Sequence, residues 1–438
     1  MRPVSLALAL ALAAAPGAGA LTLDECLDLA RHHAPSLQVS DAGIARAARA
    51  IAEARAALAP TLRLDASLVE NSEAPHIAIT LPHQPTQAFP IGQATAVDAR
   101  GIAQLPLFDR QDRALVRAAE EAHTGQLRGR EQADADLVLR VSTAFYQALA
   151  ADRLQLAAEA TVDSARAHLG TATARVRAGV AQRVDSLRAS SDLAQRQTAL
   201  LRAREAVRLS RVELDDAVGT PLDHDRPLES PGEPTAGVPD DAGAFAQAER
   251  ARPELAVLDA SLRENDRRLE AARAGRWPRL TASATAEYVA PNILDDYADW
   301  SDVGLKTYKL YAGVALSVPV FDGGATAARV GEASADGASL RARRADLALS
   351  IHREVASALG DLRVAIAVWQ SDSGRVATSR EAMRLAEAGY RGGTSTASDV
   401  RDAEAALADA LAEEAQSSMD YWIARAELDH ALGSRKGN

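Results

Sequence analysis

The sequence predicts an internally duplicated fold that combines long α-helices with membrane-spanning β-strands. Three observations predict it: an order of segments that occurs twice, helical runs too long for an ordinary globular domain, and short stretches in which apolar and polar residues alternate. The peptide that starts at Leu105 (LPLFD) recurs at Val318 (VPVFD), and the peptide from Glu213 to Gly219 (ELDDAVG) recurs from Glu427 (ELDHALG). Both matches have nearly the same spacing, which indicates a tandem duplication rather than a solenoid of short repeats.

The first residues have the layout of a secretory signal. Arg2 precedes an apolar stretch over residues 4–15, and small residues follow at 18–20. This order is typical of a cleaved signal rather than a membrane span. The predicted organisation is therefore a signal peptide at 1–20, a first structural repeat at 21–219, a Pro-rich linker at 220–241 and a second repeat at 242–438. Each repeat is expected to hold a helix, two barrel strands and a helical hairpin.

The first helix is expected to run from Leu23 to Ala59. Thr22 and Glu25 have the spacing of a capping box, and Pro35 is expected to break or kink the helix. Pro253 has the equivalent position in the second half.

Two much longer helical runs lack proline. The run over residues 109–178 would span roughly 100 Å at 1.5 Å per residue. Apolar residues in both halves follow the spacing of a coiled-coil seam, namely Leu137, Val141, Ala144 and Ala148, and then Ile351, Val355, Ala358, Leu362 and Ala365. Each half is expected to form a long antiparallel helical hairpin. In the first half the turn is at Ala178-Gly179 and the returning helix at 182–218, and in the second half they are at Gly392-Gly393 and 398–432.

Four segments alternate with the period of two that indicates a strand. They lie at residues 62–68, 96–106, 281–288 and 311–320, and each has one apolar and one polar face. Strands of an outer-membrane barrel present these faces to lipid and to a lumen; edge strands of a soluble sandwich are the alternative. Four strands cannot close a barrel, and open backbone groups in hydrocarbon cost several kcal/mol each. The chain is therefore expected to oligomerise.

Long polar connections join the paired strands. Residues 71–94 and 290–306 carry several prolines or aspartates, as expected of loops at the outer face of such a barrel.

Composition and motifs argue against several classes of function. The net charge of −11 and the pI of about 5.4 do not suit a nucleic-acid partner. Cys26 is the single cysteine, so no intrachain disulfide is expected, and it is interpreted as a small buried helix residue rather than a lipid anchor. The sequence shows no catalytic, metal or cofactor motif; His76 and His83 share a loop, but the remaining histidines are dispersed. An enzyme is not expected.

Taken in order along the chain, these elements resemble the TolC family of outer-membrane efflux proteins. The resemblance rests on the start at Leu21 (LTLDE), the proline-ended first helix, the strand pairs closing on LPLFD and VPVFDGG, and the tip sequences at 177–185 and 390–402. It implies a homotrimer whose three sets of four strands form one twelve-stranded barrel, continued by an α-helical tunnel in the periplasm. It also implies docking on a periplasmic adaptor and an inner-membrane pump.

The resemblance assigns roles to residues at the hairpin tips. Asp399 and Asp402 match acidic rings at the periplasmic entrance, which attract cations, and Tyr390 and Asp185 match residues that link neighbouring hairpins. Gly179, Val180, Gly393 and Thr394 match the tips that contact the adaptor. Ser395 stands where the family prototype has an arginine, which departs from that family's latch.

The function implied is a passive trimeric exit duct of a tripartite efflux pump or a type I secretion system. The alternatives are a non-conducting periplasmic coiled-coil adaptor, which would carry one hairpin on a β-rich domain, and an extracytoplasmic enzyme, for which no site is evident. Composition does not identify the cargo.

Overall fold

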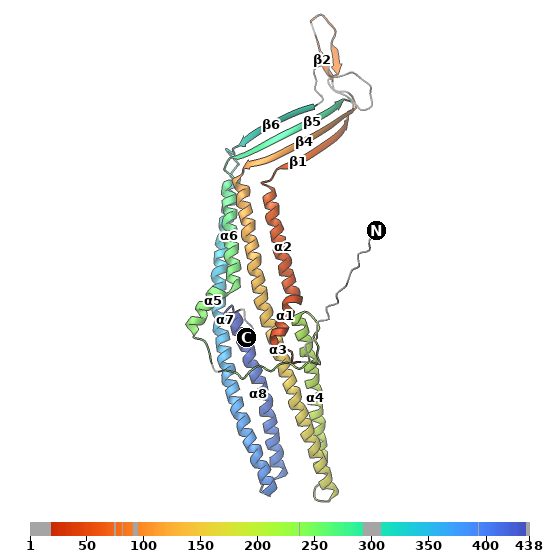
Figure 1. Cartoon of the computed structure of the whole chain (residues 1–438), viewed down its shortest axis with the longest axis vertical. Coiled ribbons are helices and arrows are strands. Elements are labelled where there is room, and N and C mark those ends of the chain that lie inside the picture. The colour runs from red at the N-terminus through yellow and green to blue at the C-terminus, as the bar shows by residue number, and fades with distance from the viewer. Residues whose placement is uncertain are drawn as a thin grey trace, which may run out of the picture. The chain divides into compact units, whose positions relative to one another are not determined.

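The computed structural model describes residues 19–73, 76–80, 82–90, 95–235, 237–291, 308–392 and 394–434. These residues separate into two compact units, each built from segments of both sequence halves. The helical unit comprises residues up to 42, 128–255 and 345 onwards, and the sheet unit comprises 43–127 and 256–344 (Figure 1). The two halves of the sequence are therefore interleaved in both units.

The short helices of the two halves have equal lengths. α1 (Leu23–His33) and α5 (Asp241–Ala251) each have 11 residues, and α2 (Pro35–Ala56) and α6 (Pro253–Ala274) each have 22. The break or kink expected at Pro35 is a break, because the helical conformation is interrupted between α1 and α2.

Proline explains this break. The residue before a proline is driven out of the helical region by contact with the proline ring, and Ala34 has ψ 122° while Arg252 has ψ 118°. Proline is nevertheless well suited to the first position of a helix, so α2 and α6 start at Pro35 and Pro253. Both halves thus form a helix pair with a bend at the same place.

The long helices form the two predicted hairpins. α3 (Arg110–Arg177) and α7 (Ala325–Gly392) each have 68 residues, and they are followed by α4 (Arg183–Val218) and α8 (Ala397–Ala431). In Figure 1 each long helix turns back into the shorter one that follows it.

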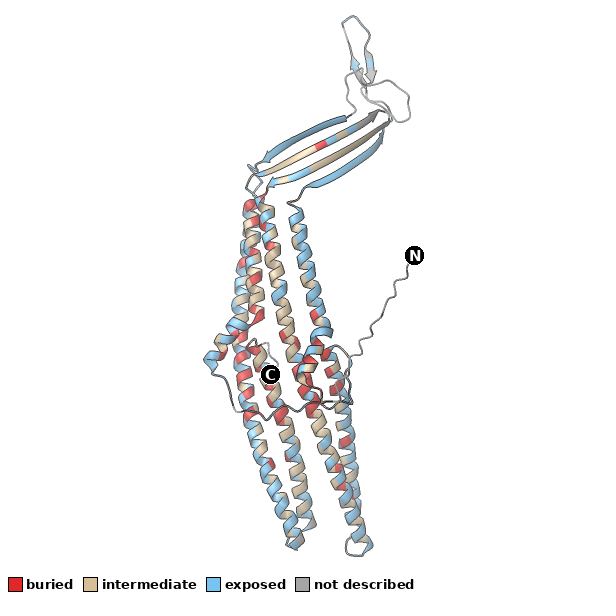
Figure 2. Cartoon of the chain, in the orientation of Figure 1, coloured by how far each residue is buried: buried red, intermediate tan, exposed pale blue. Residues whose placement is uncertain are grey.

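The predicted seams lie in two apolar cores of the helical unit. Figure 2 shows the buried residues gathered along these helices. In the first core Leu137 and Val141 pack with Cys26, Leu37 and Leu214. The second contains the equivalent seam residues of α7 (Ile351, Val355, Ala358, Leu362) together with Leu255 and Leu428. Ala365, the last predicted member, is partly buried against that core.

The linker between the halves is docked rather than free. Leu21 forms a parallel bridge with Leu228, through a hydrogen bond of 2.8 Å from its N–H to the Pro227 carbonyl. Arg226 donates to both carboxylate oxygens of Glu25, at 2.8 and 2.9 Å. One arm of the predicted capping box is present, since the Glu25 N–H donates to Thr22 Oγ1 at 3.0 Å, while the Glu25 carboxylate binds the linker.

The sheet unit contains a four-stranded antiparallel sheet of order β1-β4-β5-β6. The strands are β1 (Thr61–Glu70), β4 (Thr95–Phe108), β5 (Arg279–Pro291) and β6 (Tyr308–Ser317). The β4/β5 pairing joins the two sequence halves. All four predicted strands are present, but β6 ends at Ser317, before Pro319. Proline has no N–H for the ladder, and Val318 and Val320 therefore lie outside the strand.

The connection between β1 and β4 contains a hairpin that the sequence did not predict. It consists of β2 (His76–Ile79) and β3 (Gln87–Pro90). Most of the second long connection, residues 292–307, lies outside the described residues.

The apolar face of the four-stranded sheet is exposed: Leu62 is 82% exposed and Leu310 is 77% exposed. On the polar face Thr285, in the central strand β5, is buried, but the edge strands β1 and β6 are exposed along their whole length. A soluble protein normally buries the apolar face of a sheet. The exposed leucines are instead as expected of strands that face lipid.

The long helices are too polar to act as membrane spans. Among the helices that the structure describes, none combines the length and hydropathy needed to cross a bilayer.

Candidate functional site

The turn between α3 and α4 presents small and apolar residues to solvent. Gly179 adopts φ 74°, a left-handed conformation that glycine reaches without strain. The N–H of Val180 donates to the Arg175 carbonyl at 3.1 Å, which closes the end of α3. The side chains of Val180, Val184 and Leu187 are exposed at this tip. An exposed apolar cluster of this kind is a candidate contact surface for another protein.

The turn between α7 and α8 is closed by backbone hydrogen bonds. The Thr394 and Ser395 N–H groups both donate to the Gly389 carbonyl, at 2.8 and 3.2 Å. Tyr390 is exposed on the last turn of α7, and Thr394 is exposed in the loop. Gly393, the remaining predicted tip residue, lies outside the described residues.

Asp185 and Asp399 occupy the same structural position in the two hairpins. Each is the third residue of its helix and accepts a hydrogen bond from the backbone N–H three residues earlier: Gln182 to Asp185 Oδ2 at 3.2 Å, and Thr396 to Asp399 Oδ2 at 2.6 Å. Thr396 Oγ1 in turn accepts from the Asp399 N–H. Both carboxylates therefore act as helix caps, a geometry that does not depend on any gate or link role.

The cap also affects the charge of Asp399. The hydrogen bond from the Thr396 backbone lowers the pKa of the Asp399 carboxyl below its ordinary value of 3.8. Asp399 consequently carries its negative charge at any physiological pH, and the N-terminus of α8 supplies a favourable dipole.

Asp402 lies one turn further along α8, on the wall of a groove. The groove has a volume of about 430 Å³ and is lined by α3, α4 and α8. Asp399 and Asp402 are three residues apart and so share one face of α8. The structure thus places the two predicted gate carboxylates together, on exposed parts of the helix.

A polar contact joins the two hairpins beside this groove. His168 Nε2 lies 2.7 Å from Glu404 Oε2, and Ser164 Oγ donates to the same oxygen at 2.9 Å. Ser164 and His168 are on α3, and Glu404 is on α8. Sequence reasoning missed this contact, although the spacing of four between Ser164 and His168 does place them on one helix face.

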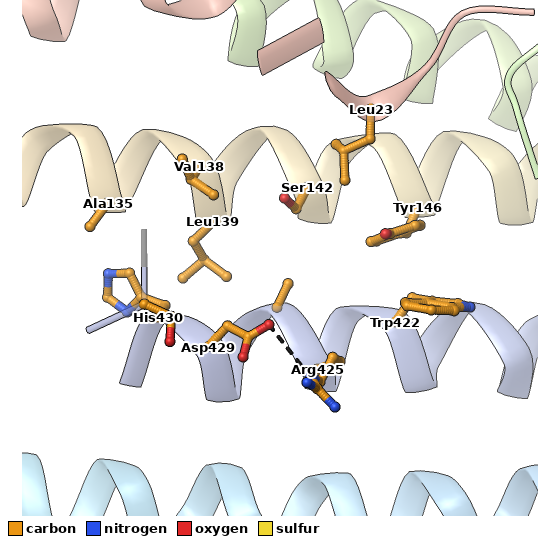
Figure 3. A pocket seen from close by; sticks show the side chains of 12 residues that line it. Leu23, Ala135, Val138, Leu139, Ser142, Tyr146, Trp422, Arg425, Asp429 and His430 are labelled. Atoms are coloured by element: carbon orange, nitrogen blue, oxygen red, sulfur yellow. Dashed lines mark hydrogen bonds and ion pairs between the residues drawn. The ribbon is translucent and has the colours of Figure 1, made fainter. Parts of the chain in front are cut away.

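Further along the same two helices, the contact between α3 and α8 is aromatic. Tyr146 and Trp422 stack with ring centroids 6.0 Å apart, and His430 Nε2 lies 2.8 Å from Asp136 Oδ1. Figure 3 shows Tyr146 and Trp422 facing one another across a small cavity, with the ion pair of Arg425 and Asp429 beside it. The cavity holds about 20 Å³, room for roughly one water molecule. It is a packing feature rather than a binding site.

Neither unit offers a metal centre in the part of the chain that the structure describes. No group of three or more His, Cys, Asp or Glu side chains is placed there to hold a metal ion.

The fold and its surfaces define a class of protein. The structure contains two long helical hairpins with exposed tips and four strands with an exposed apolar face and a polar opposite face. These are the parts of an outer-membrane channel with a helical extension. Residues 26–220 and 245–434 match the family model described as outer membrane efflux protein. The chain therefore belongs to this family, and it is an efflux protein of the outer membrane with its helical part in the periplasm.

Solved structures support the fold. VceC of Vibrio cholerae is 20% identical, with 94% of this chain and 96% of that chain covered and a TM-score of 0.72. The outer membrane channel MtrE of Neisseria gonorrhoeae is 20% identical, with 94% and 89% covered and a TM-score of 0.74. The outer membrane channel CmeC of Campylobacter jejuni is 13% identical, with 94% and 85% covered and a TM-score of 0.75. No curated protein sequence matches the chain.

Proposed function

We propose that the protein is the outer membrane channel of a tripartite efflux pump or a type I secretion system, a passive exit duct made of three copies of the chain. The observation that carries the proposal is the four-stranded sheet, with leucines exposed on one face and charged and polar residues on the other. Such a sheet is stable in lipid only when its edges are paired.

The direction of the strands permits closure between copies. Each strand is antiparallel to its neighbour in the order β1-β4-β5-β6, so β1 and β6 run in opposite directions. The β6 edge of one copy can therefore pair with the β1 edge of the next in the same antiparallel pattern. Three copies would give twelve strands, an even number as in bacterial single-chain barrels, with the polar face toward the lumen.

The helical hairpins would extend the duct and carry its contacts. In this proposal the tips at Gly179, Val180, Gly393 and Thr394 dock on a periplasmic adaptor that connects to an inner-membrane pump, and the pump supplies the energy. The exposed apolar side chains at the first tip support this assignment, because apolar patches on soluble surfaces commonly mark protein contacts. Tyr390 and Asp185 are proposed to link neighbouring hairpins.

Asp399 and Asp402 are the proposed entrance ring. With threefold symmetry, their shared helix face would place a ring of carboxylates around the opening, and such rings attract cations. The lowered pKa of Asp399 supports a permanent charge there.

Conductance across a planar lipid bilayer tests the proposal. The purified protein is expected to open cation-selective pores, and the Asp399→Asn/Asp402→Asn variant is expected to lose part of that selectivity. Asparagine is chosen because its side-chain oxygen can still accept the cap hydrogen bond, so the charge is removed with little effect on the helix. Absence of pores contradicts the channel, whereas unchanged selectivity in the variant contradicts only the ring.

A non-conducting periplasmic adaptor is the alternative. It does not account for the sheet, whose exposed leucines on β1 and β6 would face water.

A further inference from the structure

The polar face of the sheet carries a row of charges that crosses all four strands. In the strand registers, Asp65 of β1 lies opposite Arg100 of β4, Arg100 lies opposite Glu287 of β5, and Glu287 lies opposite Lys309 of β6. The signs therefore alternate from one edge of the sheet to the other. We refer to these four residues as the charge row.

Hydrogen bonds within the sheet engage three of the four charges of the row. Arg100 Nη2 donates to Glu287 Oε1 at 2.8 Å, across the pairing that joins the two sequence halves. Arg63 Nε donates to Asp65 Oδ2 at 3.0 Å along β1. Opposite charges on directly paired strands attract, and like charges there repel, so the alternation is the arrangement with the lowest electrostatic energy.

The remaining charges on this face balance as well. By alternation Arg63 and Asp98 share the face with the charge row, and they have opposite signs. Arg279, at the end of β5, lies 3.4 Å from the Asp109 carboxylate. Glu70 falls on the other face, at the end of β1. The polar face of the four strands thus carries four positive groups (Arg63, Arg100, Arg279, Lys309) and three negative ones (Asp65, Asp98, Glu287). Asp109, which directly follows β4 and pairs with Arg279, supplies the fourth negative group.

We propose that the charge row forms a belt without net charge around the barrel wall. Because its charges cancel, the wall does not select small ionic solutes by the sign of their charge. The inference rests on the proposed function, because this face lines a lumen only if copies of the chain close a barrel. Charged rings in a pore select ions by sign. Paired charges about 5 Å apart largely cancel for a solute further away than the Debye length of about 8 Å at physiological salt.

The belt and the hairpin tips would then have different effects on a passing ion. Asp399 and Asp402 would supply net negative charge at the entrance, and the barrel wall would add none. A solute that passes the entrance meets a wetted, polar but neutral surface, which suits cargo of either sign.

A substitution that neutralises one residue of the charge row should leave the barrel wall with a net charge. Arg100→Gln removes the ion-pair partner of Glu287 and the positive charge opposite Asp65, and threefold symmetry would multiply the excess negative charge. Glu287→Gln leaves an excess positive charge of the same size at the same level. The double variant Arg100→Gln/Glu287→Gln removes both charges together and keeps the wall neutral.

The test is the reversal potential in a planar bilayer under a KCl gradient, at low ionic strength where screening is weak. Relative to wild type, Arg100→Gln is expected to raise the cation-to-anion permeability ratio several-fold, and Glu287→Gln to lower it several-fold. The double variant is expected to return the ratio to the wild-type value. Ser283→Gln is the matched control, because it places the same side chain on the same face of β5 without a change in charge, and it is expected to leave the ratio unchanged.

The outcomes separate the inference from the proposed function. Pores whose reversal potential is the same in wild type and both single variants overturn the belt but leave the channel intact. A double variant that keeps the shift of either single variant also overturns it. If wild type opens no pore, the proposed function fails and the belt fails with it. Should Arg100→Gln not assemble, Lys309→Gln replaces it, with the same expected rise in the ratio.

Discussion

The two halves of the chain build the same helices with different cores. α1 and α5, α2 and α6, and α3 and α7 agree in length to the residue. Their buried seams correspond in position, and some residues are the same, such as Val141 and Val355. Others differ: Phe145 and Ala148 of the first half are matched by Leu359 and Leu362 of the second, and all four are buried. The two halves therefore have the same buried positions. At the positions that differ, a smaller side chain at one is offset by a larger side chain at the other.

The bend before α2 and α6 shows the largest difference between the halves. Ala34 and Arg252 hold the same place, immediately before the proline, and both are buried. The guanidinium of Arg252 forms ion pairs with Glu254 and Glu354 and donates to the His430 carbonyl at 3.2 Å. The first half fills this position with a methyl group, and the second half fills it with a buried ionic cluster.

Arg252→Ala is expected to give the largest loss of stability. It copies the first half at this position, but it leaves Glu254 and Glu354, whose side chains are 17% and 45% exposed, without their cation. Removing one partner of a fully buried pair costs about 3–5 kcal/mol, and the loss should lie at or below the lower end of this range because Glu354 is partly solvated. The midpoint of urea unfolding of the detergent-solubilised protein measures the effect. Arg250→Ala, which removes an exposed arginine, is the control. Equal midpoints for the two variants would contradict the assigned role.

Gly219 and Gly433 are expected to differ although both end a long hairpin helix. A Cβ on Gly433 would meet the Ala251 carbonyl carbon at 2.7 Å, whereas on Gly219 the nearest atoms, Ala34 Cα and the His33 oxygen, are at 3.1 Å. Both have positive φ, where alanine costs about 1–2 kcal/mol. Gly433→Ala should therefore lower the melting temperature more than Gly219→Ala, because the backbone it meets has less room. The reverse order would show that the close approach is not rigid.

The exchanged cores can be tested by transplanting one into the other. Ala148→Leu alone should overpack the first core and cost about 1–3 kcal/mol. Phe145→Leu/Ala148→Leu reproduces the pair found at Leu359 and Leu362, and it should be less destabilised than Ala148→Leu. Thermal unfolding followed by circular dichroism compares them, and a double variant worse than the single one would contradict compensation.

The two helix caps should differ in strength and in pH dependence. The folded-state pKa of Asp399 is depressed by its hydrogen bond, so its stabilising effect is present above the ordinary carboxyl pKa and is lost as pH falls through the lower folded value. Asp399→Asn should therefore destabilise the start of α8 slightly at neutral pH, where the charge that interacts with the helix dipole is lost, and not once the carboxyl is protonated. Asp185→Asn should cost less, because its hydrogen bond is longer. Amide exchange at the start of α4 and α8, measured at neutral and acidic pH, gives both differences. A cost at Asp399 that persists in acid would rule out a charge-dependent cap.

Cys26→Ala is expected to have the smallest effect. Its counterpart in the second core is Ala244, and Cys26 is fully buried, so the loss should be about 1 kcal/mol or less. Burial raises the pKa of the Cys26 thiol to about 12, so the folded protein should not react with a maleimide. Labelling without denaturant would contradict this packing.

Features that depend on residues close together in the sequence could be predicted, whereas contacts between distant segments could not. The seams, the hairpins and the strand faces follow from periodicity within single segments, and they were predicted. The break at Ala34 also follows from a local signal, because a proline at position 35 was expected to break or kink the helix. Thr396 and Asp399 have the spacing of a capping box, but the family resemblance assigned Asp399 to an entrance gate and the cap was not predicted.

Contacts between distant segments could not be predicted. His168 and Glu404 are 236 residues apart and meet only when the hairpins are side by side. Arg100 and Glu287 are 187 residues apart, and alternation fixes the face of each without fixing the register between strands. The charge row and the ionic cluster at Arg252 are therefore properties of the fold rather than of any local pattern.

The most direct test of the account is a crosslink between the two edges of the sheet. In a Cys26→Ala background, Thr61→Cys at the start of β1 and Ser317→Cys at the end of β6 would be treated in membranes with a short bis-maleimide, which tolerates a range of registers. The account predicts that the full double-cysteine protein forms crosslinked species up to three chains and none larger, because a closed ring leaves no free edge. Monomers alone, or a ladder that continues beyond three chains, would contradict it.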